Sequence, residues 1–371
     1  MLYGNPFAQP VPSMESLEDR PFTAVSALGA PAEDGRIYVD ASNRDVLELG
    51  GIDHPSENCG EYYRLDASRK EIYSDANRFL AHCTPGATLR FITDATSVAI
   101  DARLHCVTKM PHFTDRGIYG FDMLIGTGTS RRYIGEKMQF FVGTTEAMKD
   151  VLALPEGLKE IQINLPLYGG VQSLQLGFPT EAKVALPTKR AYKPIAFYGS
   201  SITQGGCVGR PGNSYCNVVC RALDADCRNM GFSGSAMGEQ AVAEYIGGLD
   251  LAAFVMDYDY NAPSVEHLQK THRPFFETIR RMQPELPVIF LPHVWAWDDN
   301  EEDYQRIATV RATYDAAIAA GDRNVYFIDS RNFFRDQMSD LCTVDHIHPN
   351  DLGQFIMAEE VYKALVTALK R

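Results

Sequence analysis

The stretch that decides the fold is Ile195–Gly205, which reads IAFYGSSITQG. Its first residues are apolar and aromatic, as in a buried strand, and the strand pattern stops at Gly199, which two serines follow. A helical pattern begins again near Asn213. Catalytic groups in open α/β sheets collect at the edge where the strands end. We therefore expect a strand that delivers a serine hydroxyl to the carboxyl edge of a sheet.

From this stretch to the end of the chain, strand patterns alternate with helix patterns. The predicted strands are 195–199, 227–232, 251–256, 288–291 and 325–328, and the predicted helices are 214–223, 240–246, 264–282, 301–320 and 351–369. Strands that alternate with helices form right-handed crossovers and a parallel sheet with helices on both faces. Residues 186–371 are therefore predicted to form a three-layer α/β/α domain.

The first half of the chain has short alternating segments separated by turns and few helical periods. The predicted strands are 36–40, 61–65, 88–93, 97–104, 120–125, 137–142, 159–165 and 171–176. Many short strands at near-regular spacing predict a β-sandwich or jelly roll. Pro179, Pro187 and Pro194 interrupt helix and central strand alike, so we place the boundary after residue 185. The β domain is then 1–185, with 1–34 irregular.

Composition excludes several classes of function. The 371 residues carry a formal net charge of −13, which disfavours binding to nucleic acid or to an anionic membrane surface. No apolar run is long enough to span a bilayer, and the first residues show no secretory leader pattern, so a cytoplasmic protein is expected. The eight cysteines include no Cys-x-x-Cys pair, which predicts reduced, mostly buried thiols and no structural zinc site.

Polar residues stand where four of the predicted strands end. They are Ser201, Gly234, Asn261 and His348, with Asp345 three residues before the histidine. All four ends should meet at one edge of the sheet. A serine hydroxyl is a weak nucleophile without a base, and His348 can accept its proton while Asp345 orients the imidazole.

Taken in order, these residues resemble the blocks of the SGNH hydrolase superfamily, also called GDSL-like esterases. Gly199–Ser201 matches the first block, with Ser200 in place of the usual aspartate. Ser233–Ser235 matches the glycine block, Asp259–Ala262 the asparagine block, and Asp345–Asn350 the Asp-x-x-His block. Each block alone is a weak signal, whereas four in the correct order are a strong one. The resemblance covers residues 195–369.

The resemblance implies a role for each matched residue. Ser201 would be the nucleophile, His348 the general base and Asp345 its orienting carboxylate. The backbone N–H groups of Ser201 and Gly234 and the side-chain amide of Asn261 would form the oxyanion hole. It also implies a flavodoxin-like fold for the second half.

Some carbohydrate esterases of this superfamily share Gly-Ser-Ser-Ile-Thr and an N-terminal jelly roll. The expected function is therefore a serine esterase that removes small acyl groups, most of all acetyl, from carbohydrates. We expect no cofactor and no metal. The expected partner is a small-molecule or oligosaccharide ester, with neither nucleic acid nor membrane, and the sequence is compatible with a homo-oligomer.

Substrate-binding candidates follow the strand 288–291. His293 ends that strand, and Trp295 and Trp297 stand in the loop behind it, where an aromatic face can pack on a sugar ring. A role in the core is the alternative for the tryptophans. A metal cluster of Cys342, Asp345, His346 and His348 fits no common zinc spacing.

Alternative interpretations stay open at the level of sequence. The serine turn, Asn261 and Gly234 each also fit an ordinary turn, and Asp345 fits a helix cap, although Asp351 is the better cap candidate. A carbohydrate-binding protein with a degenerate hydrolase domain is the alternative function. Within the enzyme class, a lipase, a thioesterase or an arylesterase remains open.

Overall fold

The stretch around Ser201 begins on a strand of a five-stranded parallel sheet in a computed structural model of the chain. The model describes residues 17–134, 146–294, 300–334 and 339–370. The strands are β12 (Ile195–Gly199), β13 (Cys227–Gly231), β14 (Ala253–Asp257), β15 (Val288–Phe290) and β16 (Val325–Phe327). Their spatial order is β13-β12-β14-β15-β16, and every neighbouring pair is parallel. This order is flavodoxin-like, and such sheets bind ligands outside the carboxyl ends of the strands.

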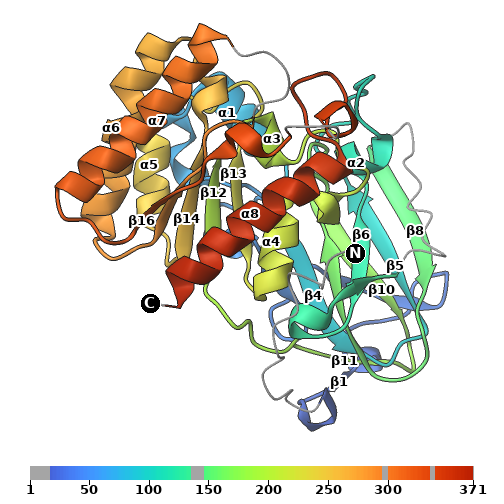
Figure 1. The fold of residues 1–371 in the computed structure, drawn as a ribbon. Helices are drawn as coiled ribbons and strands as arrows, with labels where there is room; N and C mark the ends of the chain where they lie inside the picture. Colours follow the sequence, from blue (N-terminus) through green and yellow to red (C-terminus); the bar gives the residue numbers. More distant parts are fainter. Residues whose placement is uncertain (1–16, 135–145, 295–299, 335–338, 371) are drawn as a thin grey trace, which may run out of the picture.

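Helices cover both faces of this sheet (Figure 1). One face packs against α4 (Tyr215–Leu223) and α8 (Asp351–Leu369), and the other against α5 (Gln240–Gly247), α6 (Val265–Met282) and α7 (Glu301–Ala319). Consecutive strand residues point to opposite faces, so Phe197 belongs to the core under α4 and α8, while Tyr198 belongs to the core under α5, α6 and α7. Burial on both faces explains why β12 reads as a continuous apolar run.

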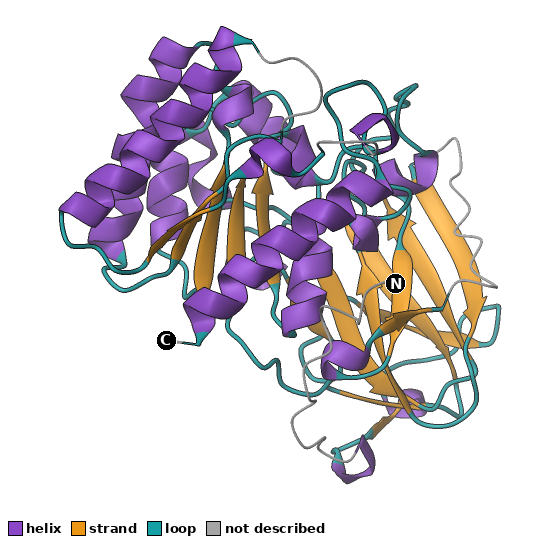
Figure 2. Cartoon of the chain, viewed as in Figure 1, coloured by secondary structure: helices purple, strands orange, loops and turns teal. Residues whose placement is uncertain are grey.

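The first half of the chain is built from two antiparallel sheets (Figure 2). The larger sheet has the order β1-β11-β4-β9-β6-β7, with β3 beside β4, and the smaller has the order β2-β10-β5-β8. The strands of the two sheets are β1 (Thr23–Ala24), β2 (Arg36–Asp40), β3 (Glu48–Gly50), β4 (Thr88–Thr93), β5 (Ser97–Arg103), β6 (Asp122–Ile125), β7 (Arg132–Tyr133), β8 (Ala147–Ala153), β9 (Lys159–Asn164), β10 (Ser173–Pro179) and β11 (Lys183–Ala185). Phe91 of β4 meets Phe178 of β10 edge to face at 5.4 Å, within a core that both sheets share. The unit is a β-sandwich, which we call the sandwich below.

The predicted fold class is confirmed, and most of the predicted elements are present within a few residues of their predicted ends. The predicted strand 61–65 is wrong, because Tyr63 and Leu65 are fully buried in the core of the parallel sheet and form no strand. Ala81, which follows the short helix α1 (Asp75–Leu80), packs in the same core. Residues 61–82 therefore tie the first half of the chain to the second. The predicted strand 137–142 lies outside the described residues.

The cap of α8 also differs from the prediction. Asn350 is the N-cap, and its side chain accepts hydrogen bonds from the N–H groups of Leu352 and Gly353. Asp351 instead accepts from the N–H of Gly209 at 2.8 Å. The difference arises because the loop from Gly206 packs against the start of α8, a contact that no local pattern reveals.

A buried network of charges joins the sandwich to the α/β half. Glu160 of β9 accepts from Arg90 at 2.7 Å and from Arg131 at 3.1 Å, and Arg131 also pairs with Asp224, the C-cap of α4, at 2.6 Å. Burial raises the pKa of Glu160, but the two guanidinium groups outweigh it and leave that pKa below its ordinary value. Removing one member of such a network leaves an unpaired buried charge, which is strongly destabilising.

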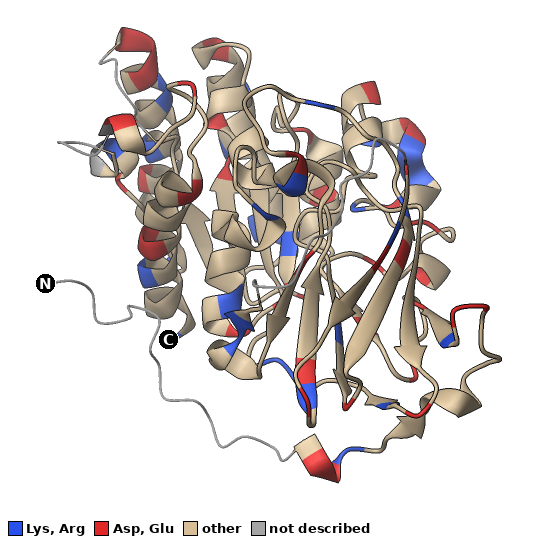
Figure 3. Cartoon of the chain, turned by 90° about the vertical axis from the view of Figure 1, so that its right-hand side faces the viewer, with Lys and Arg blue, Asp and Glu red and all other residues tan. Residues whose placement is uncertain are grey.

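Charges on the molecule are mixed in sign. Figure 3 shows acidic and basic residues interspersed over the sandwich and the helices. Among the described residues, no helix combines the length and the apolarity that crossing a membrane requires.

Candidate active site

The serine turn follows β12 without a break. Ser200 is the N-cap of the short helix α3 (Ser201–Gln204), and its hydroxyl accepts from the N–H of Ile202 at 3.1 Å. Ser201 is the first residue of α3, so its N–H has no acceptor inside the helix and is free to bind a ligand. Gly199 leaves no room for a side chain, because a Cβ there would stand 2.0 Å from Thr203 Oγ1. The turn thus presents the Ser201 hydroxyl at the carboxyl edge of the sheet.

His348 lies between Ser201 and Asp345, within hydrogen-bond distance of each. Ser201 Oγ is 2.8 Å from His348 Nε2, and His348 Nδ1 is 2.7 Å from Asp345 Oδ2. The other carboxylate oxygen of Asp345 accepts from the backbone N–H of His348 at 2.7 Å and of Ile347 at 3.1 Å. Burial raises the pKa of Asp345, but these hydrogen bonds outweigh it, so the pKa lies below its ordinary value. The arrangement can move a proton from Ser201 to an imidazole that a carboxylate orients.

The glycine and asparagine blocks lie side by side beyond these three residues. Gly234 has a φ of 68° and is exposed, and a Cβ built on it would meet no atom within 4 Å. The Asn261 Nδ2 donates to the carbonyl oxygen of Phe232 at 2.8 Å. A side-chain amide has two N–H donors, so one remains for a ligand. The structure thus places the Asn261 side chain on the loop that carries Gly234.

Gln204 ties this loop to the serine turn. Its side-chain carbonyl accepts from the N–H of Ser233 at 3.0 Å. Asn229 of β13 donates to the carbonyl oxygen of Thr203 at 2.7 Å. The N–H groups of Ser201 and Gly234 are therefore carried by two segments that bond to each other directly, as a pair of preorganised donors requires.

His293 lies beneath the turn that carries Asn261. Its side chain is buried, and its Nδ1 is 2.7 Å from Asp259 Oδ2. Burial lowers the pKa of His293, but the carboxylates of Asp259 and Asp303 outweigh this effect and raise the pKa to about 9. Arg306, also buried, donates to the carbonyl oxygens of Asp259 and Ala262 at 2.6 and 2.9 Å. Expected to bind substrate, His293 here supports the Asn261 turn and exposes almost no surface. Trp295 and Trp297 lie outside the described residues.

Asp257 is a buried acid beneath the serine turn that the sequence analysis did not single out. Its Oδ2 accepts from Thr203 Oγ1 and from Tyr215 Oη, each at 2.8 Å. Burial, followed by the charge of Asp259, raises the pKa of Asp257 to about 8. The signal that was overlooked is an aspartate at the very end of an apolar strand.

The first half of the chain also reaches the site. Arg64 is fully buried and donates four hydrogen bonds to carbonyl oxygens, two of them at Asn229 and Gly231 in β13. Tyr168 donates to the carbonyl oxygen of Ser201 at 3.2 Å. Asn77 accepts a hydrogen bond from Ser235, next to Gly234. No local pattern distinguishes these residues from ordinary sandwich and loop residues, which is why they were missed.

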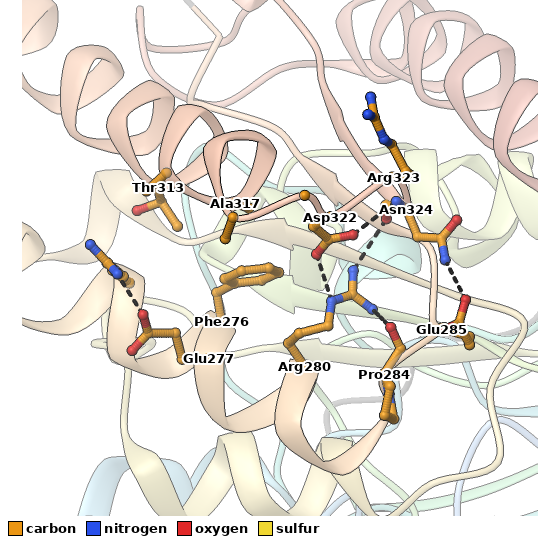
Figure 4. A pocket seen from close by; sticks show the side chains of 14 residues that line it. Phe276, Glu277, Arg280, Pro284, Glu285, Thr313, Ala317, Asp322, Arg323 and Asn324 are labelled. Carbon is orange, nitrogen blue, oxygen red and sulfur yellow. Dashed lines mark hydrogen bonds and ion pairs between the residues drawn. The ribbon is translucent and has the colours of Figure 1, made fainter.

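A separate hollow of about 480 Å³ lies between α6 and α7 (Figure 4). Its charged lining is largely paired, with Arg280 on Asp322 at 2.8 Å and Asn324 on Glu285 at 3.0 Å. Asn324 directly precedes β16, so the hollow is at the amino-terminal edge of the parallel sheet. It is therefore at the opposite edge from Ser201.

Comparison with known proteins matches both halves of the chain to family models. Residues 192–366 match the model of the GDSL-like Lipase/Acylhydrolase family, and residues 37–184 match a model described as the N-terminus of Esterase_SGNH_hydro-type. Curated proteins yield no match.

Solved structures share the fold over nearly the whole chain. A protein described as a GDSL-like lipase, from Bacteroides ovatus, is 24% identical with a TM-score of 0.80, covering 90% of this chain and 98% of that one. A salicylyl-acyltransferase from a tetracycline biosynthetic pathway is 16% identical with a TM-score of 0.73, covering 91% and 98%. A family two carbohydrate esterase from Cellvibrio japonicus is 14% identical with a TM-score of 0.60, covering 90% and 98%.

At these sequence identities the solved structures show similarity of fold only, whereas the two family models show membership of a family. The models account for most of the chain between residues 37 and 366, one on each half. The chain belongs to the SGNH (GDSL-like) hydrolase superfamily, because its two halves match family models of that superfamily over residues 37–184 and 192–366.

Proposed function

We propose that this protein is a serine esterase that removes small acyl groups, most of all acetyl, from carbohydrate esters. The observation that carries the proposal is the pair of hydrogen bonds from Ser201 Oγ to His348 Nε2, at 2.8 Å, and from His348 Nδ1 to Asp345, at 2.7 Å. Membership of the superfamily supports acyl-ester chemistry. Family two carbohydrate esterases among the structures of similar fold support a sugar ester as the substrate.

The proposed reaction has two halves. Ser201 Oγ attacks the ester carbonyl carbon while its proton moves to His348 Nε2, and Asp345 stabilises the imidazolium. The N–H groups of Ser201 and Gly234 and the free N–H of Asn261 hold the oxyanion. The C–O bond of the ester then breaks, and His348 gives the proton to the sugar alkoxide. In the second half, water attacks the acyl-serine while His348 takes a proton from it. The bond between the acyl carbon and Ser201 Oγ then breaks, His348 returns the proton to Oγ, and the carboxylic acid leaves.

The test measures acetate release from an activated acetyl ester and from an acetylated oligosaccharide. Ser201→Ala should lower kcat by on the order of 10⁴- to 10⁶-fold, as removal of a triad nucleophile does. Ser200→Ala is the matched control, because it removes the neighbouring hydroxyl, which caps α3. It should lower the free energy of unfolding by about 1 kcal/mol but leave ester hydrolysis in place. Equal activity of Ser201→Ala and the native chain would refute the nucleophile.

The rates of hydrolysis of different esters distinguish the proposed carbohydrate esterase from its alternatives. A preference for the acetylated oligosaccharide over the activated ester supports carbohydrate as the natural alcohol. Faster hydrolysis of long-chain, thiol or aryl esters would favour the lipase, thioesterase or arylesterase alternatives. Oligosaccharide binding without turnover of any ester would favour a carbohydrate-binding protein. Transfer of the acyl group to an added alcohol in preference to water would make the protein an acyltransferase.

A further inference from the structure

Two side chains that the proposed reaction does not use flank the proposed base. A ring nitrogen of His112, the Sγ of Cys207 and a ring nitrogen of His348 all lie within 4.8 Å of one another. The rings of His112 and His348 are tilted by 37°, with centroids 5.6 Å apart. His112 comes from the sandwich half, Cys207 from the segment after α3, and His348 from the loop before α8. The cluster therefore exists only in the folded chain.

Cys207 is held beside the base in a backbone conformation that a side chain disfavours. Its φ is 70°, in the left-handed region, where glycine is the usual residue. Two glycines, Gly205 and Gly206, come directly before it, yet position 207 keeps a thiol. The side chain is buried, and burial followed by the charge of Asp345 raises its pKa to about 12, so the thiol is protonated and is no nucleophile. Non-glycine residues in strained conformations concentrate at functional sites.

We propose that His112, Cys207 and His348 form an inhibitory binding site for a thiophilic divalent cation, with Zn²⁺ as the ion that fits. One thiolate and two imidazole nitrogens are ligands that Zn²⁺ prefers, and water completes a tetrahedron. Ligand atoms of one such centre stand about 3.3–3.6 Å apart, given metal–ligand bonds of ~2.0–2.3 Å. His112 is exposed, so a rotation of its side chain can close the remaining gap. The bound cation displaces the thiol proton to solvent.

Occupation of this site would switch the proposed esterase off. If the metal binds Nε2 of His348, it takes the lone pair that accepts the Ser201 proton. If it binds Nδ1, it displaces the proton shared with Asp345, and the imidazole then carries its proton on Nε2. In either mode no free lone pair faces Ser201. The inhibition rests on the proposed function, whereas binding of the metal does not.

Binding is tested on the full chain after treatment with a chelator. Zn²⁺ is titrated by calorimetry, and Co²⁺ by its absorption spectrum, in which a thiolate-to-metal band reports Cys207. His112→Ala and Cys207→Ser should each weaken Zn²⁺ binding by at least the roughly 10- to 100-fold that loss of an outer-shell partner costs. Cys207→Ser should also remove the thiolate band. Mg²⁺, which prefers oxygen ligands, should not bind at the same concentration.

Cys59→Ser is the matched control, because Cys59 also has a left-handed φ, 58°, but is exposed and lies outside the cluster. Its Zn²⁺ affinity should equal that of the native chain. Thermal unfolding of each variant shows whether the fold is intact. Because His112 is exposed, His112→Ala should disturb the fold least. Unchanged Zn²⁺ affinity in both His112→Ala and Cys207→Ser would overturn the site.

Inhibition is tested by the rate of acetyl-ester hydrolysis with Zn²⁺ and again after a chelator. Zn²⁺ should abolish the rate, the chelator should restore it, and each cluster variant should need at least 10-fold more Zn²⁺ for half-inhibition, in step with its weaker binding. Zn²⁺ bound at the cluster without loss of rate would overturn the inhibitory role. A chain that binds Zn²⁺ through Cys207 but hydrolyses no ester when metal-free would leave the metal site standing and refute the proposed function.

Discussion

Arg64 Nη1 donates to the carbonyl oxygen of Gly231 at 2.7 Å, so a side chain of the first half of the chain is bonded to the last residue of β13. The same nitrogen donates to Asn229 at 2.8 Å, and the guanidinium lies 4.5 Å from the centroid of the Phe232 ring. Gly234 follows two residues after Phe232. In the described part of the chain, the partners of Arg64 are carbonyl oxygens and this ring, and burial lowers its pKa to about 10. Arg64 therefore holds the loop that carries a proposed oxyanion donor.

Replacement of Arg64 by lysine should reduce turnover more than substrate affinity. Lysine keeps the charge but cannot reproduce a planar group bonded to four carbonyl oxygens. Displacement of the Gly234 loop by about 1 Å should cost about 100-fold in kcat, with KM changed much less. Steady-state kinetics with an acetyl ester measure both. Arg311→Lys, at an exposed arginine of α7 paired with Asp315, is the control and should leave both constants as they are. A rise in KM alone would contradict the positioning role.

Replacement of Asn261 by alanine should lower kcat by on the order of 100- to 1000-fold with little change in KM, because an oxyanion donor acts chiefly in the transition state. The hydrogen bond to Phe232 is lost as well, so the free energy of unfolding should fall by about 1 kcal/mol. Denaturant unfolding separates the two effects. The control is Asn43→Ala in the turn after β2, whose side chain accepts from the N–H of Asp45. A kcat within a few-fold of native would remove Asn261 from the oxyanion hole.

The buried acid Asp257 should make the native chain lose stability as the pH rises. Its pKa is 3.8 ordinarily and about 8 in the folded chain, so between these values the folded state binds more protons than the unfolded state. The free energy of unfolding therefore falls from about pH 4 to pH 8. The side chain of Asp257→Asn is uncharged at every pH, so the free energy of unfolding of this variant should rise relative to that of the native chain from pH 4 to pH 8. Denaturant unfolding from pH 4 to pH 9 tests this, with Asp250→Asn, an exposed partner of Lys193, as control. A stability difference that does not change with pH would mean that Asp257 is not protonated.

The pair of His293 and Asp259 should contribute stability that is also lost as the pH rises, but in a higher pH range. The pKa of His293 rises from 6.5 to about 9 on folding, so its contribution is complete below pH 6.5 and disappears as the pH rises through about 9. His293→Gln should cost about 3–5 kcal/mol at pH 6, because it leaves Asp259 buried without a cation, and clearly less above pH 9. Asp259→Asn removes the same pair and should show the same dependence. Equal cost at both pH values would contradict a charged histidine at this position.

Several elements of the fold could be predicted because their patterns are local. β12 and β14 are apolar runs that a sheet covered on both faces requires, and the described ends of β4 coincide with the predicted 88–93. Ser264 is the N-cap of α6, as its place before a helical period predicts. The ordered polar residues after the strands likewise predicted which side chains to look for, although their catalytic roles remain predictions.

Contacts between distant residues required the tertiary structure. Nothing around Arg64 in the sequence predicts that it reaches β13, and an apolar pattern at 61–65 fits a strand as well as a segment packed on another core. His293 reads as a residue at the functional edge of the sheet, yet the packing of α7 buries it against Asp259.

The sequence by itself therefore determined the alternation of strands and helices, the parallel sheet and the order of the polar blocks, because strand and helix periods and caps depend on neighbours within a few residues. Only the tertiary structure decided which buried charges are paired and which side chains surround His348. Those contacts join residues such as His112, Cys207 and His348, which the packing of the sandwich on the α/β half brings together.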